Sequence, residues 1–166
     1  MHRAAQLLWL VLPLFAANMA PPFVRWWPWR NPPIHERWLG NHKTWVGVGF
    51  AVIAASLVCF VQAHIAWRGS LIELAPRWLA VGITCGLAAM TGDALKSLVK
   101  RRIGIAPGQP WRPFDQLDFI AAGLLALSVW VALSWADVAF VLGLTWAGSE
   151  LVNRMAFRWG IKAVPW

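Results

Sequence analysis

Five long apolar stretches constrain the fold of this 166-residue chain more than any other feature of its sequence. A helix needs about 20 apolar residues to cross the roughly 30 Å hydrocarbon core of a bilayer. Backbone polar groups in lipid must be paired within their own segment, so such stretches cross as helices. The sequence therefore predicts an all-α integral membrane protein of about five transmembrane helices, over residues 4–20, 45–67, 77–97, 118–135 and 137–157.

The composition agrees with this fold class. Hydrophobic residues make up 59% of the chain and charged residues only 13%, against about a quarter charged in soluble domains. We expect one membrane domain over residues 1–166, because no internal repeat or low-complexity tract divides it. The net charge of +8 would suggest nucleic acid in a soluble protein. Here the apolar bulk favours the lipid bilayer as partner and argues against nucleic acid.

Two long loops, residues 21–44 and 98–117, are broken by Pro and Gly and carry much of the positive charge. Together with the adjoining helix end and the C-terminal segment, they hold 12 of the 15 Lys and Arg residues. The positive-inside rule then predicts cytoplasmic loops and a cytoplasmic C-terminus, with the N-terminus outside, in the inner (cytoplasmic) membrane. The first 20 residues also resemble a cleaved signal peptide, which would leave four spans with the same orientation.

Abundant Trp and two Cys have structural interpretations. Trp favours the membrane–water interface, so most of the 14 Trp residues are expected to anchor the protein there. Cys59 and Cys85 fall inside apolar stretches without paired spacing, and we expect both to be small core residues.

The stretch "GDALKSLVKRR", residues 92–102, ends the third apolar segment with a burst of charge. On a helix, Asp93, Lys96, Ser97, Lys100 and Arg101 share one face, because they are spaced i, i+3, i+4, i+7 and i+8. One interpretation is structural: the basic groups reach lipid headgroups while Asp93 pairs with Lys96 or Ser97. The functional interpretation is that Asp93 binds a divalent cation and the basic groups hold phosphates.

A second acidic pair, Asp115 and Asp118 in "WRPFDQLDF", opens the fourth apolar segment. A carboxylate at a helix start is often a cap, and one of the two has that simpler explanation. With Asp93, however, they give three carboxylates on one membrane face, which is suited to Mg²⁺ completed by water and phosphate oxygens.

Further polar residues belong to the same predicted side of the membrane. Lys43 and Thr44, in the glycine-flanked "LGNHKTWVG", are a weak pattern for a phosphate contact at a helix start. Asn18 ends the first apolar segment, and Glu150 and Asn153 lie toward the end of the last one. A water-lined site shared by several helix ends would explain these residues together.

The chain resembles the CDP-archaeol synthases, membrane enzymes related to phosphatidate cytidylyltransferases. The resemblance is carried by "ANMAP" (17–21), "LGNHKTWVG" (39–47), "GDALKSLVKRRIGIAPGQPWRPFDQLDF" (92–119) and "NRMAFRWGIKAVPW" (153–166). It implies transfer of a cytidylyl group from CTP to a membrane lipid phosphate, with Mg²⁺ as cofactor and pyrophosphate as product. It also implies that Asp93, Asp115 and Asp118 serve the metal, and that Lys43, Ser97, Lys100 and Arg101 serve the CTP phosphates.

The predicted site therefore has two groups of residues. Those expected to act in catalysis are Asp93, Lys100, Asp115 and Asp118. Those expected to bind substrate are Asn18, Lys43, Thr44, Lys96, Ser97, Arg101, Arg102, Gln116 and Asn153. Two alternatives remain open at this point: a CDP-alcohol phosphotransferase, whose longer Asp-rich signature we do not find, and a non-catalytic lipid-binding scaffold or small transporter.

Overall fold

The computed structural model describes residues 2–106 and 109–159. The described chain is helical, with one isolated bridge between Pro33 and Thr44 and no strand. Its elements are α1 (His2–Met19), the 3-10 helix η1 (Pro21–Trp26), α2 (Glu36–Leu39), α3 (Trp45–Ile65), α4 (Trp78–Arg102), α5 (Phe114–Leu127) and α6 (Trp135–Arg158). The prediction of an all-α fold is confirmed.

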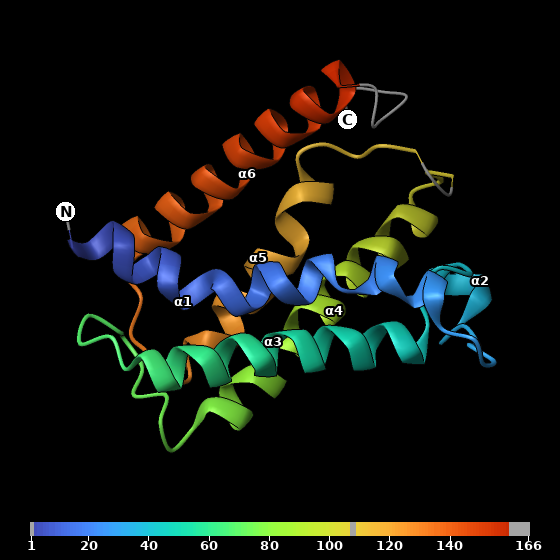
Figure 1. Ribbon diagram of the computed structural model, residues 1–166. Helices are drawn as coiled ribbons and strands as arrows, with labels where there is room; N and C mark the ends of the chain where they lie inside the picture. Colours follow the sequence, from blue (N-terminus) through green and yellow to red (C-terminus); the bar gives the residue numbers. More distant parts are fainter. Residues whose placement is uncertain (1, 107–108, 160–166) are drawn as a thin grey trace.

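The five longer helices of the described chain run in alternating directions, from side to side in Figure 1, so that the end of each lies near the start of the next. Among the described residues, three segments are long and apolar enough to cross a membrane: Arg3–Trp26, Trp45–Ile65 and Trp78–Arg102. The number of five spans stays a prediction. The fourth expected segment differs most, because α5 begins at Phe114 and ends at Leu127, and residues 128–134 are turns and loop.

The helix ends follow from local hydrogen bonding. Thr44 caps α3 by accepting the backbone N–H of Gly47 at 3.1 Å. Ser134 and Asp137 form a capping box at the start of α6, in which each side chain accepts a backbone N–H of the other residue. The helix α4 is longer than predicted, because it continues to Arg102, five residues beyond the end of the predicted span. This extension carries Lys100, Arg101 and Arg102 on helical backbone.

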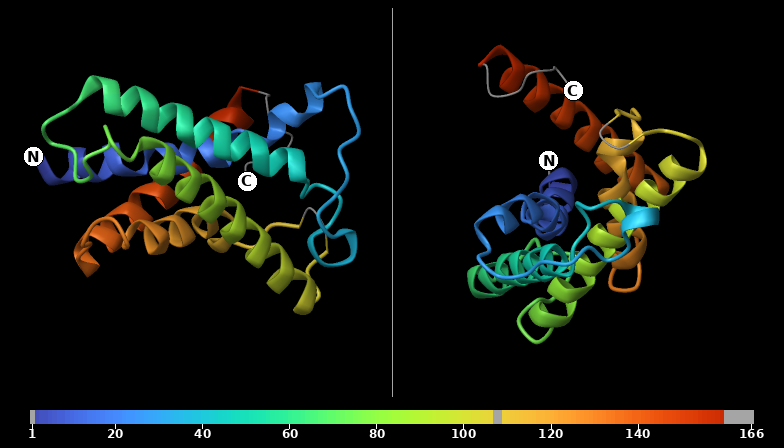
Figure 2. Two further views of the ribbon diagram at one scale, coloured as in Figure 1. Left: turned by 90° about the horizontal axis from the view of Figure 1, so that it is seen from below. Right: turned by 90° about the vertical axis from the view of Figure 1, so that its right-hand side faces the viewer.

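The core lies where α1, α3, α4 and α5 meet, and α1 packs into it along its length (Figure 2). Leu7, Val11 and Leu14 of α1 are each at most 2% exposed. Cys59 and Cys85 are free thiols, fully buried, which confirms that they are core residues.

The outer surface of the bundle is apolar and bears exposed Trp at both ends. Trp135 at the start of α6 is 89% exposed, while Trp26, Trp29 and Trp45 at the opposite end are each more than 60% exposed. Amphipathic indole rings are typical of the two membrane–water interfaces. The exposed rings thus mark the two faces of a bundle embedded in a bilayer, and the loops 21–44 and 103–113 adjoin one and the same end.

Candidate active site

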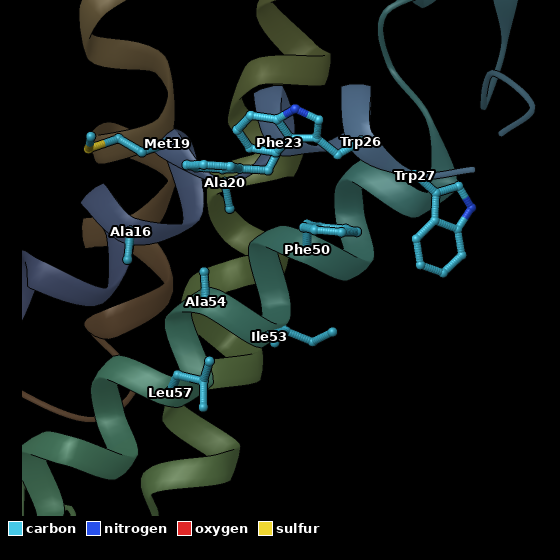
Figure 3. A pocket seen from close by; sticks show the side chains of 10 residues that line it. All are labelled: Ala16, Met19, Ala20, Phe23, Trp26, Trp27, Phe50, Ile53, Ala54 and Leu57. Carbon is cyan, nitrogen blue, oxygen red and sulfur yellow. The ribbon is translucent and has the colours of Figure 1, made fainter. Parts of the chain in front are cut away.

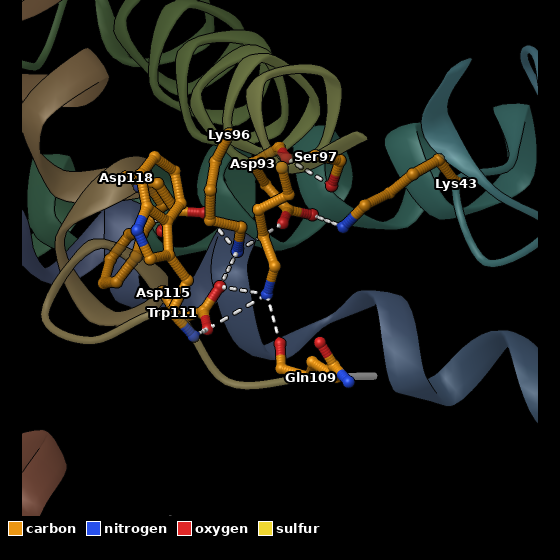
Figure 4. Close-up of polar contacts among 10 residues, drawn as sticks. Lys43, Asp93, Lys96, Ser97, Gln109, Trp111, Asp115 and Asp118 are labelled. Carbon is orange, nitrogen blue, oxygen red and sulfur yellow. Dashed lines mark hydrogen bonds and ion pairs between the residues drawn. The ribbon is translucent and has the colours of Figure 1, made fainter. Parts of the chain in front are cut away.

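Three carboxylates surround one ammonium group at the loop-bearing end of the bundle. Lys96 Nζ lies 3.1 Å from Asp93 Oδ1, 3.4 Å from Asp115 Oδ1 and 2.7 Å from Asp118 Oδ2 (Figure 4). Asp93 stands one turn before Lys96 on α4, and the other two acids come from the first turns of α5. The helical face predicted from residues 92–102 and the acids of "DQLD" therefore meet at one point.

Gly92 is what lets the two helices come this close. A Cβ atom at this position would fall on the backbone carbonyl of Asp118 and lie 2.8 Å from Ala122 Cβ. Any side chain at residue 92 would push α5 away from α4, and Asp118 with it. The glycine directly before Asp93 thus positions the carboxylates of the neighbouring helix.

Two further lysines complete an alternating network of charges. Lys43, from the first loop, forms an ion pair with Asp93. Lys100 Nζ lies 3.1 and 3.2 Å from the two carboxylate oxygens of Asp115 and also donates to the Gln109 carbonyl. Half-buried charges are tolerated because each has a partner of opposite sign.

The network keeps Asp115 ionised. Burial by itself would raise the pKa of its carboxyl group, but hydrogen bonds from the Trp111 N–H and the Lys100 ammonium outweigh burial and hold this pKa below its ordinary value. Asp115 is therefore an anion at neutral pH and can interact with a cation.

A polar cavity of about 420 Å³ opens beside the network, between α2, the following loop and the ends of α4 and α5. Five basic residues and three acidic residues line it: Arg37, Lys43, Lys96, Lys100 and Arg101 against Glu36, Asp93 and Asp115. This excess of positive charge suits an anionic ligand. Ser97, at the same wall, donates its hydroxyl to the Asp93 backbone carbonyl at 2.9 Å.

The remaining predicted site residues are divided between other places. Thr44 uses its hydroxyl to cap α3, and Arg102 is exposed at the end of α4, whereas Arg101 lines the polar cavity and also donates to the Ile105 carbonyl. The other three, Asn18, Gln116 and Asn153, line a second cavity, of which Lys100 and Asp115 are also part. Gln116 Nε2 also donates to Glu150 Oε1 of α6 at 2.8 Å.

Sequence reasoning missed Glu36, Arg37 and His42, which line the polar cavity from α2 and its loop. Their spacing carries no chemical pattern, and only the position of the loop against α4 brings them to the site. Lys162 and the rest of residues 160–166, where the C-terminal motif of the resemblance ends, lie outside the described residues.

The site was also predicted to hold a metal ion. In the described part of the chain, no three His, Cys, Asp or Glu side chains stand ready as a metal-binding group. The Lys96 ammonium lies among the three carboxylates instead. The donor set nevertheless fits a hard cation, because the three side chains offer oxygen atoms around one positively charged centre.

Comparisons with known proteins agree on one family. A family model described as CarS-like, CDP-archaeol synthase, matches residues 32–166. The CDP-archaeol synthase of Sulfurisphaera tokodaii is 34% identical, over 93% of this chain and 92% of its own. Those of Sulfolobus acidocaldarius and Hyperthermus butylicus are 32% and 30% identical, over 93% and 94% of this chain and 93% and 92% of their own.

A solved structure shares the fold. It is described as an intramembrane enzyme for archaeal membrane lipids biosynthesis, and it superposes with a TM-score of 0.69 at 24% identity. The match covers 87% of this chain and 90% of the other. The helical bundle seen here is therefore a fold already found in a membrane-embedded protein.

Proposed function

Because the chain belongs to the CDP-archaeol synthase family, we propose that it transfers a cytidylyl group from CTP to a membrane lipid phosphate. The product is a CDP-lipid, and pyrophosphate is released. The observation that carries the proposal is the basic cavity lined by Asp93, Lys96 and Asp115, with Asp118 paired to Lys96 behind its wall. A nucleoside triphosphate is an anion that needs such a concentration of positive charge.

The reaction is an in-line displacement at phosphorus. An oxygen of the lipid phosphate forms a bond to the α-phosphorus of CTP, while the bond from this phosphorus to the bridging oxygen of the β-phosphate breaks. The electron pair of that bond leaves with pyrophosphate. Catalysis then rests on positioning and on offsetting negative charge, so no covalent intermediate with the protein is needed.

The basic residues of the polar cavity have the chemistry for this task. Lys43, Lys100 and Arg101 line one hollow from two separate segments, so they can hold the triphosphate from both sides. Lys43 and Lys100 each pair with a carboxylate, which orients the ammonium groups before CTP binds. The Ser97 hydroxyl at the same wall donates to the Asp93 carbonyl and would have to turn away from it to donate to a phosphate oxygen.

Asp93, Asp115 and Asp118 would hold Mg²⁺, the cofactor that the family resemblance implies. The ion would supply charge neutralisation of the triphosphate when bound. The Lys96 ammonium sits where the three carboxylates converge, so it must leave that position for the ion. Lys96 would then be available to the phosphates of CTP.

We also propose that the loop-bearing end faces the cytoplasm, in the cytoplasmic membrane, with the N-terminus outside. CTP is a cytoplasmic metabolite, and the cavity that suits it adjoins the loops 21–44 and 103–113. The excess of Lys and Arg at this end supports the same orientation.

One assay tests the function. The purified protein is supplied with labelled CTP, Mg²⁺ and a panel of a diether and a diacyl glycerol phosphate, and CDP-lipid is measured. We expect product from at least one acceptor and none after chelation of the metal. Failure to form a CDP-lipid from any acceptor would overturn the proposal.

Substitutions of the carboxylates test which residues form the site. Asp93→Asn and Asp115→Asn should each lower kcat at least about 100-fold, because they remove charge from the metal-binding group. Glu73→Gln is the matched control, since Glu73 is an exposed acid in the loop at the opposite end. Equal activity in Asp93→Asn and Glu73→Gln, with both variants folded, would remove Asp93 from the site.

A further inference from the structure

The ammonium group of Lys96 is fully occupied by acids. The carboxylates of Asp93, Asp115 and Asp118 all lie within 3.4 Å of its nitrogen (Figure 4). An ammonium group has three N–H donors and no acceptor. Three carboxylates thus match the three donors of one side chain, and no donor is left for a phosphate. In this arrangement Lys96 serves the acids of the site and not a substrate.

The three carboxylates do not depend on Lys96 equally. Each of the other two acids has a second lysine, which comes from the first loop or from the next turn of α4. In the part of the chain that the structure describes, Lys96 is the one cation within ion-pair distance of Asp118. The Asp118 side chain is only 6% exposed, so water cannot take the place of that cation. Removing one partner of a buried ion pair is strongly destabilising.

The packing of α4 against α5 keeps the acids together. The backbone carbonyl of Asp118 occupies the space that a side chain at Gly92 would fill, so the two helices are in backbone contact. The acids of α5 therefore cannot move away from Asp93 to relieve the repulsion between like charges. A cation must stand among the three carboxylates at all times, and it is either the Lys96 ammonium or a metal ion.

The polar cavity gives Lys96 a second place for its ammonium group. Lys96 lines this cavity together with Lys43, Lys100 and Arg101, the residues to which the triphosphate is assigned. A lysine ammonium is carried on a flexible stem of four carbons. It can therefore turn from the carboxylates to a phosphate in the cavity while the backbone of α4 stays in place.

A neighbouring hollow offers no such place. The hollow between α1, η1 and α3 is lined entirely by apolar and aromatic side chains, including Phe23, Trp26 and Phe50 (Figure 3). It provides no group that would hold a phosphate or attract a cation. Of these two hollows, only the polar cavity provides the Lys96 ammonium with another anion, and it does so only when a triphosphate is bound there.

We infer that Lys96 is an exchangeable counter-ion, whose ammonium group stands among the three carboxylates until a metal ion and a nucleotide replace it together. This inference rests on the proposed function and deepens it. A metal ion alone must displace the ammonium and leaves it without an anion, so metal alone binds weakly. A nucleotide supplies a phosphate for the displaced ammonium, so metal and nucleotide favour each other's binding. Lys96 is thus a positioning residue that links the metal ion to the substrate.

Thermal unfolding of the detergent-purified protein tests this exchange without turnover. Lys96→Met keeps the length of the side chain and removes its charge. With a chelator present, we expect its Tm to lie about 6 °C or more below that of the unaltered protein, because Asp118 has lost its cation. Saturating Mg²⁺ should recover most of this loss, since the ion no longer has a competitor. The Tm of the unaltered protein should rise by less than about 2 °C in Mg²⁺ alone.

Lys100→Met is the matched control. Lys100 stands one turn further along α4, where it pairs with Asp115 and donates to the Gln109 carbonyl, so its loss also lowers Tm. Lys96 remains among the carboxylates in this variant, and Mg²⁺ should therefore raise Tm by less than about 2 °C. NaCl at matched ionic strength controls for screening and should restore neither variant. Equal recovery in Mg²⁺ by Lys96→Met and Lys100→Met would overturn the inference.

A double variant guards against misfolding of Lys96→Met. Lys96→Met/Asp118→Asn removes the cation together with the acid that depends on it, and each remaining acid keeps a lysine. Its Tm in chelator should lie above that of Lys96→Met and respond little to Mg²⁺. If Lys96→Met can be purified only with Mg²⁺ present, the expected loss is simply larger. The inference fails if Lys96→Met unfolds alike with and without Mg²⁺, or if the double variant is no more stable than Lys96→Met in chelator.

The link to the nucleotide is measured by adding CTP without a lipid acceptor. In the unaltered protein, most of the rise in Tm should require Mg²⁺ and CTP together, whereas in Lys96→Met Mg²⁺ alone should give most of it. The same share from Mg²⁺ alone in both proteins would contradict the link. The proposed function fails separately, because it is overturned only when the unaltered protein forms no CDP-lipid in the assay above.

Discussion

Glycines at the contact between α3 and α4 have no free space around them, whereas the glycines of α6 do. On α4, a Cβ at Gly82 or Gly86 would lie 2.5 Å from the Cα atom of Ser56 or Val52. On α6, a Cβ at Gly148, which lines the cavity between α1 and α6, would have no neighbour within 4 Å, and neither would a Cβ at Gly143, in the adjoining hollow between α5 and α6. Small residues let the first pair of helices touch through their backbones, whereas the second pair leaves space between them.

This difference separates helices that are packed against each other from helices that leave a cavity between them. Close packing of small residues is a main source of helix association in membranes, where lipid is as apolar as the side chains. It holds α4 against α3, and Gly92 likewise holds α4 against α5, so the charged network stands on fixed helices. Between α6 and α1, by contrast, a cavity of about 880 Å³ stays open. The predictions below test this contrast.

The largest effect is expected from a bulky residue in the tight contact. Gly86→Leu must separate α3 from α4, because its side chain meets backbone atoms of Val52 that cannot rotate away. We expect a loss of stability of about 3 kcal/mol or more, measured as a fall in Tm of the detergent-purified protein. Gly143→Leu is the control, and an equal Tm for the two variants would contradict the contrast.

An intermediate effect, of opposite sign at the two places, is expected from a single methyl group. Gly86→Ala should destabilise the protein by about 1–3 kcal/mol through overpacking. Gly143→Ala should stabilise it by about 0.5–1 kcal/mol, because alanine favours helix more than glycine and the added methyl group meets no neighbour. Denaturant titration of both variants measures the two signs, and destabilisation by Gly143→Ala would show that this face is packed.

The smallest effect on stability is expected at the far end of that cavity. Arg3→Gln removes the ion pair with Asp137 that joins α1 to α6, but the Arg3 side chain is 46% exposed and solvent screens the interaction. We expect a slight fall in Tm, because the lost ion pair is partly exposed to solvent and therefore contributes little. A Tm loss as large as that of Gly86→Leu would mean that α6 is part of the tight core.

Sequence patterns predicted the helices and the polar face more successfully than the shape of the site. The i, i+3, i+4 and i+7 spacing placed Asp93, Lys96, Ser97 and Lys100 on one side of α4, and the structure brings these residues to one site. The end of the fourth segment was harder to predict. The apolar run continues past Leu127 in the sequence, but the helix α5 ends at this residue. Apolar character does not reveal where a chain turns.

The sequence by itself determined an all-α membrane protein, its family and the residues that gather charge at one end. These follow from local properties: the length of apolar runs, helical periodicity and motif order. Only the tertiary structure decided that Lys96 lies among three carboxylates and that Asn18 and Asn153 belong to a separate cavity. Distances between helices depend on how closely their surfaces can pack, and that depends on pairs of residues far apart in the chain, such as Gly92 and Asp118.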